Sequence, residues 1–325
     1  MKSKSQAELD PDLLEKFTIA VQEEVAYCDT CQPWDGGDTI WIHGVEVDWE
    51  DVFNDCEVPK EYREEVASRI QCPFCGSSLD IFCTIGVKSK WERNFEMQSD
   101  QWQEKNKSRF DDFYAFLQKF PYLGCSHELG KTIINSINNF PKSKILDEKW
   151  YRSRKVNSSV IFSPSDMMPP DPDKVEIPEG RFNHFGQPVF YLSRSKECAA
   201  TEALDSDEGM VWTQEFRIKG IKDILDLAPD GTWPEVPDGF DEIAFGLVHC
   251  DTINKTPLSS GWKPEYFIPR FIADVAKMMG YDGIKFKSSK TYHENLVLFK
   301  WDINNIEAVG TPVVYQHRKT LLNSL

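Results

Sequence analysis

Four of the nine cysteines form two pairs in which two residues separate the partners: Cys28 and Cys31 in CDTC, and Cys72 and Cys75 in CPFCG. Two cysteines at this spacing can direct both sulfurs at one zinc ion. Four thiolates complete the tetrahedral shell and leave no position for water. The sequence therefore predicts a structural zinc site. Cys56 and Cys83 are alternative ligands, but each is more simply a small buried apolar side chain.

Arginines beside aromatic residues form a second group of candidates, in the second half of the chain. WYRSRK (150–155) holds two of them, and GRFNHFGQPVFYL (180–192) combines an arginine-containing turn with an apolar strand. Arginine is planar, always charged and able to form two parallel hydrogen bonds, so it suits phosphate oxygens. The polar and aromatic candidates in these two segments are Arg152, Arg154, Arg181, Asn183 and Tyr191.

A carboxylate and a pair of serines complete this group. If Ser195 caps a helix, Ala199, Glu202 and Ala203 share one face of it. That face is otherwise made of small residues that pack closely on a sheet, where a carboxylate is costly unless it has a task or a partner. Further on, GYDGIKFKSSKTYHENLVLF (280–299) reads as two strands around the serine pair 288–289.

These segments together resemble the RES-domain family, named for an Arg, a Glu and a Ser. Its members have an early aromatic-Arg element, a Gly-Arg-Trp-Asn turn, a strand ending in Tyr-Leu-Ala, a helix with Glu, and a late Asp-Gly-Ile-x-Tyr-x-Ser segment before an Asn-Leu-Val-Leu-Phe strand. Order and spacing agree over residues 146–300. The chain departs from the pattern at Phe182, Ser193 and Phe286, where Trp, Ala and Tyr are usual.

The resemblance implies an ADP-ribosyltransferase-like fold with a split β-sheet, and an enzyme that consumes NAD. The nicotinamide–ribose bond would be cleaved, with water (glycohydrolase), phosphate (phosphorylase) or a macromolecule (ADP-ribosyltransferase) as acceptor. Many members are toxins with an antitoxin, so a toxin or antiphage defence effector, neutralised by an antitoxin or immunity protein, is expected. The resemblance implies the catalytic residues Glu202, Arg152, Tyr191 and Ser288, and the NAD-binding residues Arg152, Arg154, Arg181, Asn183, Tyr191 and Ser288, with the choice between Arg152 and Arg154 as catalytic arginine left open.

The residue types suit this chemistry. A tyrosine ring stacked on the cationic nicotinamide gains about 0.5–2 kcal/mol. Loss of nicotinamide builds positive charge on the ribose, which a fixed carboxylate such as Glu202 stabilises. Nicotinamide leaves as a neutral molecule, so a second carboxylic acid is not required. A hydroxyl such as that of Ser288 orients the ribose or the carboxamide.

The helices and strands that must position these residues do not alternate regularly along the sequence. This order predicts the α+β class. We expect a zinc-ribbon-like domain over residues 1–86, a helical connector over 87–145 and the RES-like domain over 146–325. Apolar spacing predicts helices at 12–26, 59–70 and 266–279. Strands are expected at 188–192, 211–218, 223–227, 283–286 and 295–299.

Composition limits the partners. The 37 basic and 53 acidic residues give a net charge of −16, which argues against nucleic acid and favours a small ligand or a protein, including a second copy of the chain. No apolar run is long enough to cross a membrane, so we expect a soluble cytoplasmic protein without disulfides. The alternative reading is a zinc-dependent module that binds protein or nucleic acid, attached to a catalytically inactive RES-like sensor.

Overall fold

The computed structural model describes residues 9–140, 142–156, 160–204, 206, 208–228, 242–249, 263–291, 293–302 and 304–318. The chain forms two compact units, Met1–Gln98 and Ser99–Leu325. Helix α4 (Lys90–Lys119) begins in the first unit and ends in the second. The expected three-part division at residues 86 and 145 stays a prediction.

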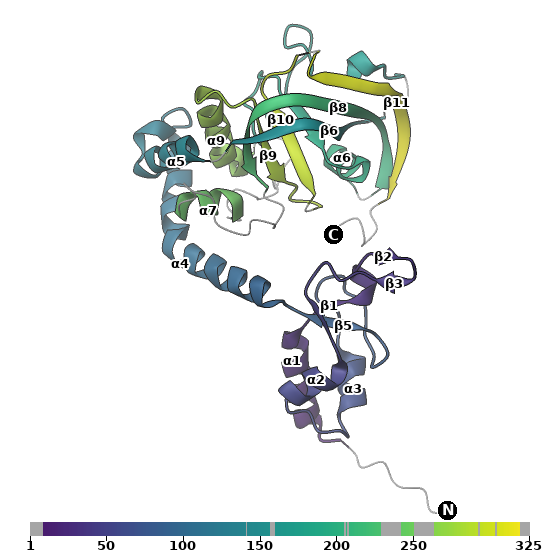
Figure 1. Ribbon diagram of the computed structural model, residues 1–325. Coiled ribbons are helices and arrows are strands. Elements are labelled where there is room, and N and C mark those ends of the chain that lie inside the picture. Colours follow the sequence, from purple (N-terminus) through teal and green to yellow (C-terminus); the bar gives the residue numbers. More distant parts are fainter. Residues whose placement is uncertain are drawn as a thin grey trace, which may run out of the picture. The chain divides into compact units, whose positions relative to one another are not determined.

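The first unit combines three helices with a small antiparallel sheet in the order β1-β5-β4 (Figure 1). Its elements are α1 (Pro11–Glu24), β1 (Val25–Cys28), the 3-10 turn η1 (Asp29–Cys31), β2 (Trp34–Asp35), β3 (Asp38–Thr39), β4 (Val45–Val47), α2 (Trp49–Asp55), α3 (Arg63–Arg69) and β5 (Ile85–Val87). The side chain of Asp10 caps α1 by accepting the backbone N–H of Asp12 at 2.9 Å. α1 and α3 confirm the helices expected at 12–26 and 59–70.

The second unit contains a six-stranded sheet in the order β11-β8-β6-β7-β10-β9. Its strands are β6 (Lys142–Lys155), β7 (Phe190–Ser193), β8 (Glu208–Leu227), β9 (Gly283–Lys287), β10 (Glu294–Leu298) and β11 (Ile306–Arg318). The end of β8 also pairs with β9 in parallel, whereas the other neighbours are antiparallel. β11 therefore pairs with the first half of β8, and β9 pairs with its last residues. The sheet is split because β8 has different neighbours along its two halves.

β8 corrects the expectation of two strands at 211–218 and 223–227, because the structure has one strand of 20 residues. Gly220 lies between the two halves with φ +67°, a conformation that glycine adopts without steric cost. The partner strand β6 pairs on both sides of this glycine and shifts its register only further on, between Ser143 and Ile145, opposite residues 221–224. The strand therefore continues through the glycine. β11 was not expected at all.

Helices cover one face of this sheet, and a second apolar cluster fills the other. α4, α5 (Glu128–Asn139), α7 (Glu242–His249) and α9 (Phe267–Met278) share a core with β9 and with Val297 of β10. Leu296 and Leu298 of the same strand join the second cluster, around Trp150 and Phe190. Side chains alternate between faces along a strand, so the two clusters lie on opposite faces.

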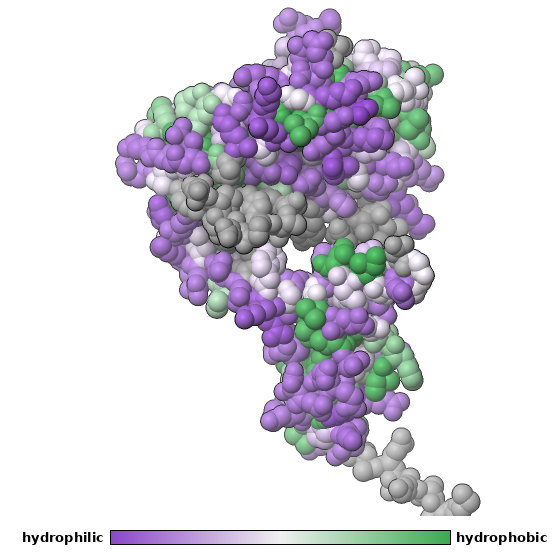
Figure 2. Space-filling model, in the orientation of Figure 1, coloured by the Kyte–Doolittle hydropathy of each residue, from purple (hydrophilic) through white to green (hydrophobic). Residues whose placement is uncertain are grey.

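The mixture of sheet and helices confirms the α+β class. α9, β7, β9 and β10 confirm the helix and strands expected there. Among the described residues, no helix is long and apolar enough to cross a membrane. Hydrophilic side chains dominate the face of the second unit that Figure 2 shows.

Candidate active site

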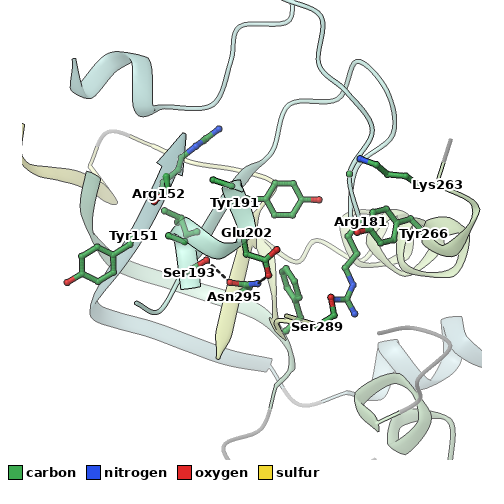
Figure 3. A pocket seen from close by; sticks show the side chains of 16 residues that line it. Tyr151, Arg152, Arg181, Tyr191, Ser193, Glu202, Lys263, Tyr266, Ser289 and Asn295 are labelled. Atoms are coloured by element: carbon green, nitrogen blue, oxygen red, sulfur yellow. Dashed lines mark hydrogen bonds between the residues drawn. The ribbon is translucent and has the colours of Figure 1, made fainter. Parts of the chain in front are cut away.

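A cavity of about 320 Å³ in the second unit collects most of the predicted site residues (Figure 3). Its walls come from β6, β7, β10, the helix α6 (Lys196–Ala203), the turn around Arg181 and the 3-10 turn η4 (Pro264–Tyr266). Of the predicted residues, Arg152, Arg181, Tyr191 and Glu202 line it, whereas Arg154, Asn183 and Ser288 do not.

Arg181 is held in a tight turn and between two aromatic rings. Gly180 and Asn183 form an isolated β-bridge. A Cβ at Gly180 would lie 2.3 Å from Asn183 Oδ1, so the turn requires glycine there. The Arg181 guanidinium lies 5.4 Å from the ring centroid of Phe182 and 5.1 Å from that of Phe286. Both positions depart from the family pattern, and both keep an aromatic ring beside the arginine.

Burial fixes the electrostatics of Arg181. The residue is 8% exposed, and its Nη1 donates to the Lys287 carbonyl at 3.4 Å. Burial lowers its pKa, and the neighbouring Tyr266 and Glu202 act in the opposite direction. Arginine keeps its charge at neutral pH despite such a shift. The result is a preorganised cation at one end of the cavity.

The carboxylate of Glu202 is held by hydrogen bonds from Ser288, which follows β9, and from Asn295 of β10. Its Oε1 accepts hydrogen bonds from the Ser288 hydroxyl at 2.6 Å and from Asn295 Nδ2 at 2.9 Å. Its Oε2 has no hydrogen-bond partner among the described residues. The residue is exposed, which corrects the expectation of a carboxylate buried on the small-residue face. Glu202 lies in the last turn of α6, where its side chain reaches the cavity wall.

Asn295 and Ser288 are themselves fixed by further hydrogen bonds. The Ser193 hydroxyl donates to Asn295 Oδ1 at 2.6 Å. Ser288 Oγ accepts the backbone N–H groups of Lys290 at 3.1 Å and Thr291 at 3.2 Å. Ser288 therefore contacts Glu202 and does not itself line the cavity.

Tyr191 presents its ring to the cavity and uses its hydroxyl internally. The hydroxyl accepts the Phe182 N–H at 2.8 Å and donates to Asn183 Oδ1 at 3.1 Å. Burial raises the pKa of this phenol. Asn183 Nδ2 donates to the carbonyls of Pro178, His184 and Gln187. All polar atoms of the Asn183 side chain are thus engaged, and the residue supports the turn.

The two early arginines differ in position. The Arg152 guanidinium lies 5.2 Å from the Phe190 ring centroid and, in Figure 3, points away from Glu202. Its Nη1 is buried without a hydrogen-bond partner among the described residues. Burial and the charge of Arg154 lower the pKa of Arg152. Arg154 donates from Nη2 to the Met168 carbonyl at 3.0 Å and lies outside the cavity. Of the two, Arg152 is placed to meet a ligand.

The cavity wall also includes residues that the sequence did not single out, among them Lys263 and Tyr266. Lys263 and Tyr266 precede α9 and line the cavity beside Arg181 (Figure 3). Burial raises the pKa of Tyr266 to about 12. The sequence offers only a weak signal here, a lysine and a tyrosine around Pro264. Among the described residues, three cationic side chains and one carboxylate line the cavity, so the cavity favours an anionic ligand although the chain is acidic.

The four predicted cysteines meet in the first unit, and their Sγ atoms all lie within 4.8 Å of one another. Cys28 Sγ lies 3.7 Å from Cys31 Sγ and 3.5 Å from Cys75 Sγ, and Cys31 Sγ lies 3.8 Å from Cys72 Sγ. A zinc–sulfur bond of about 2.3 Å places tetrahedral sulfurs about 3.8 Å apart. The cluster therefore fits a four-thiolate metal ion, and Cys56 and Cys83 are not part of it.

The family model of the RES domain matches residues 149–319, more than half of the chain. The chain belongs to the RES-domain family. The match spans all the predicted site residues of the second unit and confirms the resemblance seen in the sequence. The cysteine cluster lies outside the matched part.

Other comparisons add little to the RES assignment. No curated protein matches the chain. One solved structure that resembles it is titled as the M. tuberculosis MbcT–MbcA toxin–antitoxin complex. Sequence identity is 11%, the TM-score is 0.36, and the match covers 57% of this chain and 92% of that chain. A TM-score this low supports no inference about the site.

Proposed function

We propose that this RES-domain protein cleaves the nicotinamide–ribose bond of NAD⁺. The observation that carries the proposal is the cavity itself, whose lining holds Arg152, Arg181 and Lys263 together with the carboxylate of Glu202; the Oε2 atom of Glu202 has no hydrogen-bond partner among the described residues. A dinucleotide brings two phosphates for the arginines and a ribose for the carboxylate. Membership of the RES family supports the same assignment.

In the proposed reaction, the cationic side chains bind the diphosphate through charge-assisted hydrogen bonds. The Tyr191 ring offers its face to the nicotinamide, whose positive charge favours that contact. Glu202 Oε2 accepts a hydrogen bond from a ribose hydroxyl, or it lies against the ribose and stabilises the positive charge that develops there. A preorganised charge of this kind contributes about 3–4 kcal/mol to the transition state.

The bond changes balance with an acceptor. The bond between the ribose C1′ and the nicotinamide nitrogen breaks, and its electron pair stays on nicotinamide, which leaves neutral. With water as acceptor, the water oxygen bonds to C1′ and one proton is released to solvent. Phosphate or a macromolecular nucleophile would take the place of water, and the product identifies which one reacts.

We further propose that the four cysteines of the first unit bind zinc, because their spacing and sulfur distances fit a closed tetrahedral shell. Such a site is structural and takes no part in the reaction. An enzyme that consumes NAD inside a cell is toxic to it. We therefore expect the protein to act as an intracellular toxin or defence effector restrained by an antitoxin or immunity protein.

Incubation of the purified full chain with NAD⁺ tests the activity. Chromatography with mass spectrometry should detect free nicotinamide, and the second product reports the acceptor: ADP-ribose, a phosphorylated ADP-ribose, or a modified macromolecule. Parallel reactions contain buffer alone, inorganic phosphate or cell lysate. If NAD⁺ persists in all three, the proposal is wrong, and a catalytically inactive ligand sensor becomes the better reading.

A further inference from the structure

Arg270, a buried arginine of α9, is bonded to the two residues that precede Arg181. It is 3% exposed. Its Nη1 forms an ion pair with Glu179 Oε2 at 2.9 Å, and its Nε donates to the Gly180 carbonyl at 3.0 Å. The Arg270 guanidinium therefore binds both the Glu179 side chain and the Gly180 backbone, directly before Arg181.

The carboxylate of Glu179 uses its other oxygen for a second segment of the cavity wall. Its Oε1 accepts the backbone N–H of Lys263 at 3.1 Å, and the Lys263 Nζ donates to the Glu179 carbonyl at 3.3 Å. The Arg270 guanidinium also lies 5.7 Å from the ring centroid of Tyr266. The pair thus joins α9 to the Arg181 turn and to both cavity residues before the helix.

The Arg181 turn is consequently fixed from two sides. On the strand side, Tyr191 and Asn183 bond within the turn. On the helix side, Arg270 pairs with Glu179 before the turn, and Asp274 of α9 contacts His184 after it at 2.7 Å. A buried ion pair adds little net stability over apolar packing, but loss of one partner is costly because it strands the other charge. The role of the pair at this place therefore lies in geometry more than in net stability.

We infer that Arg270 and Glu179 are positioning residues. They fix the places of three cavity residues, Arg181, Lys263 and Tyr266, so that these can bind an anionic substrate. Neither residue lines the cavity. The inference rests on the proposed function for its substrate, the NAD⁺ diphosphate. The ordering of Arg181 by this pair does not depend on which anion binds.

A double-mutant cycle on the full chain tests the inference through NAD⁺ kinetics. E179Q and R270Q should each raise KM at least about tenfold and leave kcat within about threefold, because they disorder a binding group and not the reacting one. The double variant should be no worse than R270Q, since both act through one pair. R270K should recover part of the loss. K219Q, which breaks the exposed Lys219–Glu307 pair far from the cavity, is the matched control.

A measurement without ligand separates this inference from the proposed function. The Arg181 Nε–Hε signal in ¹⁵N spectra, assigned with R181K, should report a rigid side chain in the wild type and a mobile one in E179Q. Wild-type order of Arg181 in folded E179Q and R270Q, or wild-type KM in both, would overturn the inference. If the wild-type protein leaves NAD⁺ intact while Arg181 still loses order in E179Q, the proposed function fails and the positioning role stands.

Discussion

The Ser288 hydroxyl donates a 2.6 Å hydrogen bond to the carboxylate of Glu202, although 86 residues separate the two in the sequence. Ser288 is 2% exposed and lies in the turn after β9, whereas Glu202 lies on α6. Two backbone N–H groups fix the serine oxygen and leave its proton for the carboxylate. From these hydrogen bonds we expect the serine to orient the glutamate.

Replacement of Ser288 by alanine removes this hydrogen bond and leaves Asn295 as the remaining partner of Glu202. A hydrogen bond to a charged group contributes about 1.5–3 kcal/mol. We expect S288A to lower kcat/KM for NAD⁺ by about 10–100-fold, as measured by nicotinamide release. S289A, the neighbouring serine on the cavity wall, should lose less. Equal losses in the two variants would show that Ser288 has no orienting role.

The charge of Glu202 is expected to matter more than its hydrogen bonds. E202Q keeps the shape of the side chain but removes the negative charge that faces the ribose. Loss of one preorganised charge should lower kcat by about 10²-fold or more. E197Q on the same helix is the control, because Glu197 contacts Tyr315 and not the cavity. Wild-type turnover in folded E202Q would remove Glu202 from the mechanism.

The cysteine cluster predicts about one zinc ion per chain, measurable by elemental mass spectrometry. Structural zinc contributes about 10–16 kcal/mol in zinc-finger peptides, so C72S should lose the metal and lower the melting temperature of the first unit. C125S carries the same substitution at an exposed cysteine of the second unit and should keep the bound zinc and the wild-type melting temperature. Full zinc content in C72S would point to a different ligand set.

Cys198 lies beside the site but is not expected to act as a nucleophile. Burial raises the pKa of Cys198 to about 11, and its Sγ accepts a hydrogen bond from the Thr291 hydroxyl at 3.0 Å. Below that pKa the reactive thiolate is the minor form, and its fraction rises about tenfold per pH unit. Peptide mapping should find Cys198 unmodified by iodoacetamide at pH 8, when exposed Cys125 is labelled. Fast labelling of Cys198 at pH 8 would contradict the burial seen here.

Local patterns in the sequence were sufficient for the residues whose role depends on near neighbours. The spacing within CDTC and CPFCG identifies a four-sulfur cluster, because a short turn sets both sulfurs of each pair. The order of Arg, Tyr, Glu and Ser identifies the RES family. Apolar periodicity predicts α9, and the strands β9 and β10 follow from short apolar runs. The continuation of β8 through Gly220 was not predictable, because it depends on the pairing with β6.

Only the tertiary structure decided which of the candidates share a cavity. Arg152 and Arg154 are equivalent in the sequence, but one lines the cavity and the other binds the Met168 carbonyl. Glu202, expected to be buried, is exposed, and the sequence gives only a weak signal at Lys263 and Tyr266 and none at Arg270. The positions of Glu202, Lys263 and Arg270 are set by contacts with segments 84 to 93 residues away. The direction of a side chain relative to another segment is not encoded in its own neighbours.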